Sequence, residues 1–208
     1  DPALARRIQA NPGLRVPGCW NGFELAVRAI LGQQVGVKGA TTLAGRMVKA
    51  LGQPLSATAG ITHLFPTPQI LADANFSGVG LTGARAETIR ALARAVCDGQ
   101  LSFEAVADSA DFLAHLCEIP GIGKWTAQYV AMRALREPDA FPSSDLGLLR
   151  ALDLTSAREL ERRAEAWRPW RSYAAVHLWN SAPDSKDSRG TRNSSGPAAD
   201  LTPIATSA

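Results

Sequence analysis

The sequence lacks the cysteine content of a disulfide framework or a metal cluster. Its 208 residues include three cysteines, Cys19, Cys97 and Cys117, which are odd in number and widely separated. This spacing fits neither paired disulfides nor a four-cysteine zinc or iron–sulfur site, so we expect buried free thiols.

Long apolar runs are also absent. The sequence has no stretch of about eighteen apolar residues, and the opening residues DPALARRIQA carry neither the apolar core nor the cleavage site of a secretory signal. We therefore expect a cytosolic protein with no membrane partner. Because the chain begins at Asp1 rather than Met, we also expect it to be a piece of a longer protein.

The sequence also lacks a strong charge of one sign and the pattern typical of β-strands. The net charge of +3 and the pI near 9.0 permit nucleic-acid binding without requiring it. Between 20 and 179, apolar residues recur at helical spacing between Gly and Pro breaks, with no sustained alternation of period two. With 46% hydrophobic residues the chain can bury a core, and we expect one all-α unit over 1–182.

After 183 the composition turns to Ser, Gly, Pro, Thr and Asp, which predicts a disordered tail over 183–208.

The helices are predicted from apolar stripes and from end signals. The predicted helices cover 23–31, 37–51, a short segment opened by Thr67-Pro68, 84–96, a segment from the capping box at Ser156 and Glu159 to Trp167, and a last segment opened by Pro169.

The most informative segment is the predicted hairpin at 116–126, which reads LCEIPGIGKWT between two apolar helices. Gly121 and Gly123 let the backbone approach a ligand closely, and the N–H groups that open the second helix lack partners. Such a helix start binds anions, and against duplex DNA it would hold a backbone phosphate without reading sequence. Ordinary helix corners also use Pro and Gly, so the motif alone leaves both interpretations open.

A second motif follows about twenty residues later, where DAFPSSDL places Asp145 directly before an apolar helix. Taken alone, such an acid is more typical of a helix N-cap than of a catalyst. A hairpin followed by this Pro-to-Asp turn is the pattern of the helix–hairpin–helix, Gly-Pro-Asp (HhH-GPD) DNA glycosylase superfamily, which the sequence resembles. Within this superfamily it closely resembles the inducible bacterial branch for alkylation repair. The resemblance covers about 13 to 179 and is carried by LRVPGCWNGFELAVRAILGQQV, EIPGIGKWTAQYVAMRAL, DAFPSSDLGLL and WRPWRSYAAVHLWN.

The resemblance implies an all-α, two-lobed body with the active-site cleft between the lobes. It also implies a monofunctional DNA glycosylase of base excision repair, which flips alkylated purines such as 3-methyladenine out of double-stranded DNA and hydrolyses the N-glycosidic bond. Asp145 matches the family's catalytic carboxylate, which would stabilise an oxocarbenium-like sugar or orient the attacking water. A base alkylated at a ring nitrogen is already cationic and leaves without protonation, so one carboxylate can suffice.

The resemblance places three aromatic residues in the base pocket, namely Trp125, Tyr129 and Trp179. A cationic base is held well against electron-rich rings. Trp125 and Tyr129 are four residues apart and share a helical face, although core packing is the alternative for all three. We assign the remaining tryptophans to packing: Trp20, Trp167 and Trp170.

The resemblance also implies contacts to DNA and to a cation. Gln34 matches the residue that fills the gap left by the flipped base, where many relatives carry Leu. No cofactor is required, but the family's hairpin holds a monovalent cation, Na⁺ or K⁺, through main-chain carbonyls, here those of Cys117, Ile119 and Ile122. The expected contacts to the DNA backbone come from Gly121, Gly123, Lys124 and Thr126.

Two alternative functions remain at this point. A bifunctional glycosylase and lyase would need a Lys where Trp125 stands, and Lys124 is one residue early, a rotation of about 100° on a helix. A non-catalytic helix–hairpin–helix module would bind duplex DNA and would need neither Asp145 nor a base pocket. We expect a monomer that lacks the family's N-terminal β domain, and in some relatives a fused alkylation-response regulator precedes the glycosylase.

Overall fold

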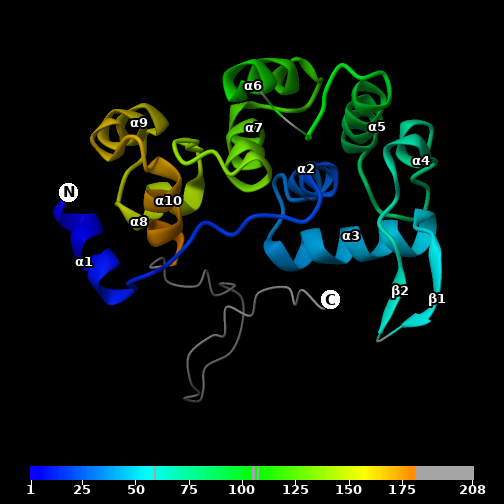
Figure 1. Ribbon diagram of the computed structural model, residues 1–208, viewed down its shortest axis with the longest axis horizontal. Helices are drawn as coiled ribbons and strands as arrows, with labels where there is room; N and C mark the ends of the chain where they lie inside the picture. Colours follow the sequence, from blue (N-terminus) through cyan, green and yellow to red (C-terminus); the bar gives the residue numbers. More distant parts are fainter. Residues whose placement is uncertain (59, 105, 107, 181–208) are drawn as a thin grey trace.

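Helices make up nearly all the regular structure of the computed structural model, which describes residues 1–58, 60–104, 106 and 108–180 (Figure 1). The all-α prediction is confirmed, and the predicted tail lies outside the described residues. The elements are α1 (Pro2–Ala10), α2 (Gly22–Leu31), α3 (Val37–Leu51), β1 (Pro54–Thr58), β2 (Ile61–His63), α4 (Pro68–Ala72), α5 (Gly83–Cys97), α6 (Ser109–Glu118), α7 (Lys124–Val130), the π-helical turn η1 (Ala131–Leu135), α8 (Leu146–Ala151), α9 (Ala157–Ala164), the 3₁₀ turn η2 (Glu165–Trp167) and α10 (Arg171–Trp179).

The end signals read from the sequence place most helix starts correctly. Thr67 caps α4 with Pro68 in its first turn, and Ser156 caps α9 by accepting a hydrogen bond from the N–H of Glu159. The last helix begins at Arg171, two residues later than predicted. The reason is a turn that contains Pro169, closed by a hydrogen bond from the N–H of Trp170 to the carbonyl of Trp167.

Three elements were not predicted. The antiparallel pair β1 and β2 is too short for an alternation of period two to stand out, and Gly60 turns the chain with a φ of 86°. Helix α1 buries only Leu4, so it has almost no apolar stripe. It is defined instead by its start, where the Asp1 side chain accepts a hydrogen bond from the N–H of Ala3 and Pro2 opens the helix.

Two hydrophobic cores divide the described residues into two lobes. The large lobe contains α2 to α7 with β1 and β2, and its core includes Ile30 and Leu92. The small lobe contains α1 and α8 to α10, and its core includes Leu148 and Leu178. Figure 1 shows α1, α8, α9 and α10 on one side of α7, with α4, α5 and the strands on the other. The continuous segment α7–η1 joins the two cores.

Several burial predictions were wrong. Cys97 and Cys117 are exposed and Cys19 is half-buried, so the thiols are not core residues. Trp167 packs in the small lobe at 6% exposure, as expected, but Trp20 is 97% and Trp170 58% exposed. The composition of a helical chain does not tell which aromatic residue faces outward.

None of the described helices combines the length and apolarity that a membrane span requires.

The hairpin between α6 and α7 packs tightly against α5 through Gly121. This glycine has a φ of 90°, and a Cβ atom placed on it would lie 2.0 Å from Oγ1 of Thr88. Gly123 differs, because its φ is −93° and a Cβ atom there would meet nothing within 4 Å. The first glycine is therefore required by the fold, and the second is not.

We expect Gly121→Ala to destabilise the protein by about 2 to 5 kcal/mol, because the strain of a positive φ adds to overpacking against Thr88. Urea unfolding followed by circular dichroism measures this change. Gly123→Ala is the matched control and should cost no more than about 1 kcal/mol, the loss expected when alanine replaces glycine at a helix N-cap. Equal stability of the two variants would contradict the packing described above.

Candidate functional site

The carboxylate of Asp145 lies at the junction of three helices. It is the N-cap of α8, with Oδ1 accepting a hydrogen bond of 3.0 Å from the N–H of Leu148. Oδ1 also accepts a 2.8 Å bond from the indole Nε1 of Trp179 on α10, and Oδ2 accepts a 2.8 Å bond from Nε1 of Trp125 on α7. The N-cap interpretation is therefore correct, and both carboxylate oxygens face tryptophans as well.

The three aromatic residues predicted for a base pocket lie together around this carboxylate. The Trp125 and Tyr129 rings are stacked, with centroids 5.4 Å apart and an interplanar angle of 7°. The Tyr129 and Trp179 rings meet edge to face, with centroids 6.4 Å apart. All three side chains are half-buried, as is Asp145. The cluster thus leaves aromatic surface open beside a fixed negative charge.

Arg133 is a residue of this cluster that sequence reasoning missed. It lies one helical turn after Tyr129, donates a 2.8 Å hydrogen bond to the Tyr129 hydroxyl, and also donates to the carbonyl of Pro17. Its guanidinium carbon is 5.5 Å from the centre of the Tyr129 ring. The spacing of four residues was the available signal. Arg133 fixes the outer edge of Tyr129 to the segment that precedes α2.

The loop that follows α2 is bound to the hairpin through Gln33. Its side-chain Nε2 donates to the carbonyl of Gly121 at 2.9 Å and to Oγ1 of Thr126 at 3.1 Å. Its main-chain carbonyl accepts a hydrogen bond from Arg85 on α5. Gln33 was not predicted as a functional residue, because a glutamine in a loop carries no signal of partners 88 or 93 residues away.

The predicted DNA-contacting residues differ in exposure. Gln34 is exposed beside this anchor and has a φ of 56°, an uncommon backbone conformation for a non-glycine residue. Gly121, Gly123 and Lys124 are exposed at the hairpin. Thr126 is only 3% exposed, and its hydroxyl accepts a hydrogen bond from Gln33.

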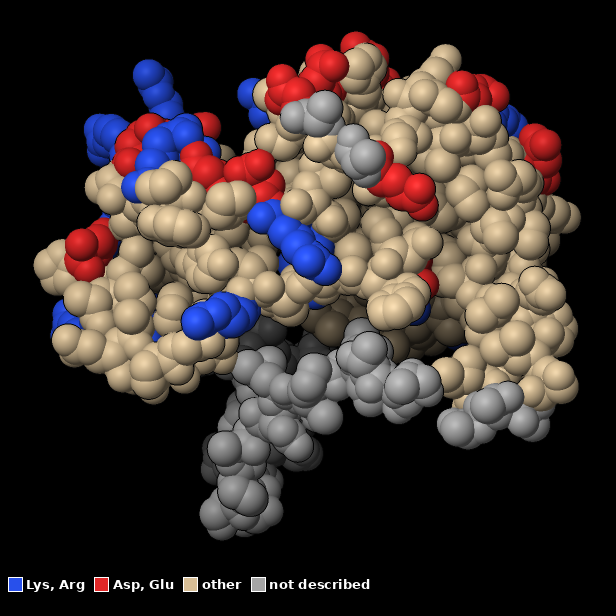
Figure 2. Space-filling model, viewed as in Figure 1, with Lys and Arg blue, Asp and Glu red and all other residues tan. Residues whose placement is uncertain are grey.

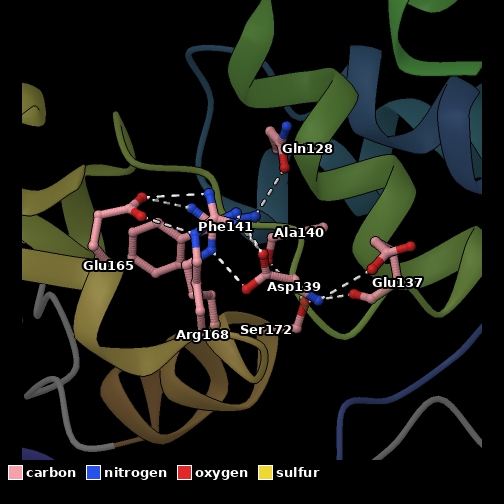
Figure 3. A network of polar contacts seen from close by, with 9 residues as sticks. Gln128, Glu137, Asp139, Ala140, Phe141, Glu165, Arg168 and Ser172 are labelled. Carbon is pink, nitrogen blue, oxygen red and sulfur yellow. Dashed lines mark hydrogen bonds and ion pairs between the residues drawn. The ribbon is translucent and has the colours of Figure 1, made fainter. Parts of the chain in front are cut away.

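The segment 137–144, which leads to Asp145, is held by a polar network of its own (Figure 3). Arg171 binds both oxygens of Asp139, at 2.8 and 2.9 Å, and Arg168 binds the same carboxylate. The hydroxyl of Ser172 is within 2.7 Å of the carbonyls of Glu137 and Ala140, and the N–H of Phe141 donates to Gln128 on α7 at 2.9 Å. The segment is therefore attached to α7 and α10, the helices that carry the tryptophans.

Three titratable groups near this region have shifted pKa values. The hydrogen bond between Arg168 and Glu165 lowers the pKa of the exposed Glu165 carboxyl and raises the pKa of the Arg168 guanidinium. Burial lowers the pKa of His177, which lies on α10 two residues before Trp179. No charge of the Asp145 cluster is among the causes of these shifts.

Two surface hollows lie away from the Asp145 cluster. Two surface hollows of about 440 and 290 Å³ are lined by α1 residues and by residues around Arg136, and neither reaches Asp145. No group of three or more His, Cys, Asp or Glu residues among the described residues is placed to hold a metal ion. In the view of Figure 2, α6 carries mainly acidic side chains and α9 a mixture of both signs, so charge does not mark a binding face on this side of the molecule.

Fold and site together define a helix–hairpin–helix protein with a carboxylate set among aromatic rings. Residues 27–172 match the model of the HhH-GPD superfamily of base excision DNA repair proteins. The chain belongs to this family, which confirms the family predicted from the motifs.

Curated relatives agree with this assignment. The chain is 44% identical over 184 residues to a probable bifunctional transcriptional activator and DNA repair enzyme, AlkA, of Mycobacterium tuberculosis, covering 86% of this chain and 37% of that protein. It is 39% identical over 180 residues to DNA-3-methyladenine glycosylase 2 of Escherichia coli, covering 85% of this chain and 64% of that protein. The chain thus spans between about a third and two thirds of these relatives.

Solved structures share the fold. A DNA-3-methyladenine glycosidase from Bacillus halodurans has 26% identity and a TM-score of 0.71, covering 88% of this chain and 86% of that one. The 3-methyladenine DNA glycosylase of Schizosaccharomyces pombe, solved with abasic DNA, has 21% identity and a TM-score of 0.74, covering 86% of this chain and 91% of that one. The two-lobed helical glycosylase fold expected from the sequence is confirmed.

We expect Asp139→Asn to destabilise the protein by about 2 to 4 kcal/mol, because it leaves the mostly buried Arg171 without its two charged hydrogen bonds. Thermal and urea unfolding measure the loss. Glu165→Gln, which removes an exposed carboxylate from the same network, is the control and should change stability much less. If both variants unfold together with the parent protein, Asp139 does not anchor this segment.

Proposed function

We propose that this chain is the glycosylase domain of a base excision repair enzyme that removes alkylated purines from double-stranded DNA. One observation carries the proposal: the Asp145 carboxylate is held by two indole N–H groups beside an open aromatic cluster. The match to the HhH-GPD family model and the names of the relatives support it. The substrate class, of the 3-methyladenine type, comes from those relatives.

The aromatic cluster suits a cationic base. Stacking of a base on an aromatic side chain contributes about 1 to 3 kcal/mol, and a positive charge over an electron-rich ring adds to this attraction. Trp125 and Tyr129 are already parallel and only half-buried, so the pair offers a preformed aromatic surface to a flat base. We assign base binding to Trp125, Tyr129 and Trp179.

Asp145 supplies the charge that the reaction needs. As the bond between C1′ and the base breaks, positive charge develops on the sugar, and a fixed carboxylate stabilises it or orients the attacking water. The base carries its own positive charge, so it departs as a neutral molecule without a general acid. Water adds to C1′ and loses a proton, which leaves an abasic site and the free base.

The hairpin and the loop after α2 are the proposed DNA contacts. Gly123 begins a continuous helical segment, 124–135, without a side-chain cap, so its first N–H groups are available to a backbone phosphate. Lys124 is exposed at the same place. Gln34 projects from a loop fixed by Gln33, and we assign it to the gap left by the flipped base.

The hairpin also suits a monovalent cation. Carbonyl oxygens at the end of α6 carry partial negative charge, and no backbone N–H of the described residues donates to the carbonyl of Cys117 or Ile122. We propose that these two carbonyls, with that of Ile119, hold Na⁺ or K⁺. The ion would stiffen the turn that faces phosphate. No other cofactor is needed for the reaction proposed here.

The lengths of the relatives support a longer natural protein with further domains. The chain covers 37% of a relative named as both transcriptional activator and repair enzyme, so we include a fused alkylation-response regulator and an N-terminal β domain in the proposal. We further propose that the enzyme acts as a monomer on the bacterial nucleoid in the cytoplasm.

We expect Asp145→Asn to slow base release by about 100-fold or more, since the carboxylate charge is lost. Asparagine is also a good N-cap, so α8 and the fold should persist. The measurement is chromatography of bases freed from methylated duplex DNA under single-turnover conditions. Asp153→Asn, an exposed carboxylate after α8, is the control and should release bases at the parent rate. A parent chain that binds the duplex but frees no base would indicate a DNA-binding module without catalysis.

We expect no covalent adduct when the protein reacts with methylated DNA in the presence of borohydride. Trp125 occupies the position of the lyase amine and donates to Asp145, while Lys124 is exposed on another side of α7. Gel electrophoresis under denaturing conditions detects such adducts, with a known lyase as positive control. A trapped complex that disappears in Lys124→Arg would establish the bifunctional alternative.

A further inference from the structure

Gly147, in the first turn of α8, lies against the Asp145 cluster without having been predicted as a site residue. A Cβ atom built on it would lie 3.0 Å from Oδ1 of Asp145, 3.2 Å from Cδ1 of Trp179 and 3.4 Å from Nε1 of Trp179. The last two atoms belong to the indole that donates the 2.8 Å bond to Oδ1. A methyl group at 147 would therefore press on both ends of that hydrogen bond.

The backbone conformation does not explain this glycine. Gly147 has an ordinary helical conformation, in which alanine is preferred to glycine, and it is not among the residues of positive φ. Gly45 in α3 is a useful comparison, because a Cβ atom there would meet nothing within 4 Å. What distinguishes Gly147 is the close approach of α10 to α8 at the indole of Trp179.

We propose that Gly147 is a positioning residue whose missing side chain lets Trp179 reach Asp145. Oδ1 is also held by the N–H of Leu148, and Oδ2 by Trp125, so the carboxylate has little freedom to yield. The indole is the group that must retreat when a methyl group is added. Its retreat lengthens one carboxylate hydrogen bond and moves one wall of the aromatic cluster.

This inference rests on the proposed function where it concerns catalysis, but its structural part is measured without activity. In ¹⁵N–¹H spectra each tryptophan indole gives one cross-peak, and Trp179→Phe assigns the peak of Trp179. Gly147→Ala should shift that peak strongly and speed its exchange with solvent. The peak of Trp167, whose indole donates to Asp1 at 3.2 Å in the small lobe, is the internal reference and should not move.

The activity test uses the same variants. Gly147→Ala should slow single-turnover base release by about tenfold or more, the loss expected for one hydrogen bond to a charged group. Gly45→Ala, also a glycine-to-alanine change within a helix, should leave the rate and the Trp179 peak unchanged. In the Trp179→Phe background, which lacks the N–H, Gly147→Ala should cause less than about a twofold further loss.

The outcomes separate the two proposals. An unmoved Trp179 peak in Gly147→Ala overturns the positioning role, whatever the activity. Losses that simply add in the double variant also overturn it, because the residues would then act independently. A shifted Trp179 peak in a chain whose parent form frees no base supports the role of Gly147 and contradicts the proposed function instead.

Discussion

The carboxylate of Asp145 is the acceptor on which the arrangement of the site depends. Three N–H donors from three helices converge on its two oxygens: the main chain at the start of α8, an indole from α7 and an indole from α10. A hydrogen bond to a charged group contributes about 1.5 to 3 kcal/mol, so the set is strong enough to fix the side chain in one rotamer. The same contacts fix the two tryptophans, and hence the aromatic cluster, relative to the charge.

These hydrogen bonds form only if other segments hold the three helices in fixed relative positions. α7–η1 belongs to both cores, with Val130 in the large lobe and Met132 in the small one. The Asp139 network attaches the segment before Asp145 to α10, and Gln33 attaches the loop after α2 to the hairpin. The loops proposed to contact DNA and the carboxylate are thereby parts of one arrangement built on α7.

The sequence predicted the members of this cluster better than the groups that hold it. Asp145, Trp125 and Tyr129 were predicted from their match to the family's motifs, and the spacing of four residues placed the two rings on one helical face. The partners of Gln33, and the pairing of Asp139 with Arg171 across 32 residues, depend on how helices pack. Gly147 is visible only when the position of Trp179 is known. Trp20 was misjudged for the same reason, since its exposure depends on tertiary packing.

The need for such support follows from the energetics of the proposed reaction. Taking a base out of the duplex costs a few kcal/mol, and stacking it on an aromatic side chain returns only about 1 to 3 kcal/mol. Little binding free energy would remain to order a loose site. Rings that are already parallel, and a carboxylate that is already oriented, spare the enzyme that cost and let the charge act when the glycosidic bond breaks. Residues that support Asp145 and its tryptophans from outside the cluster, such as Asp139, therefore matter to the rate although they touch no substrate.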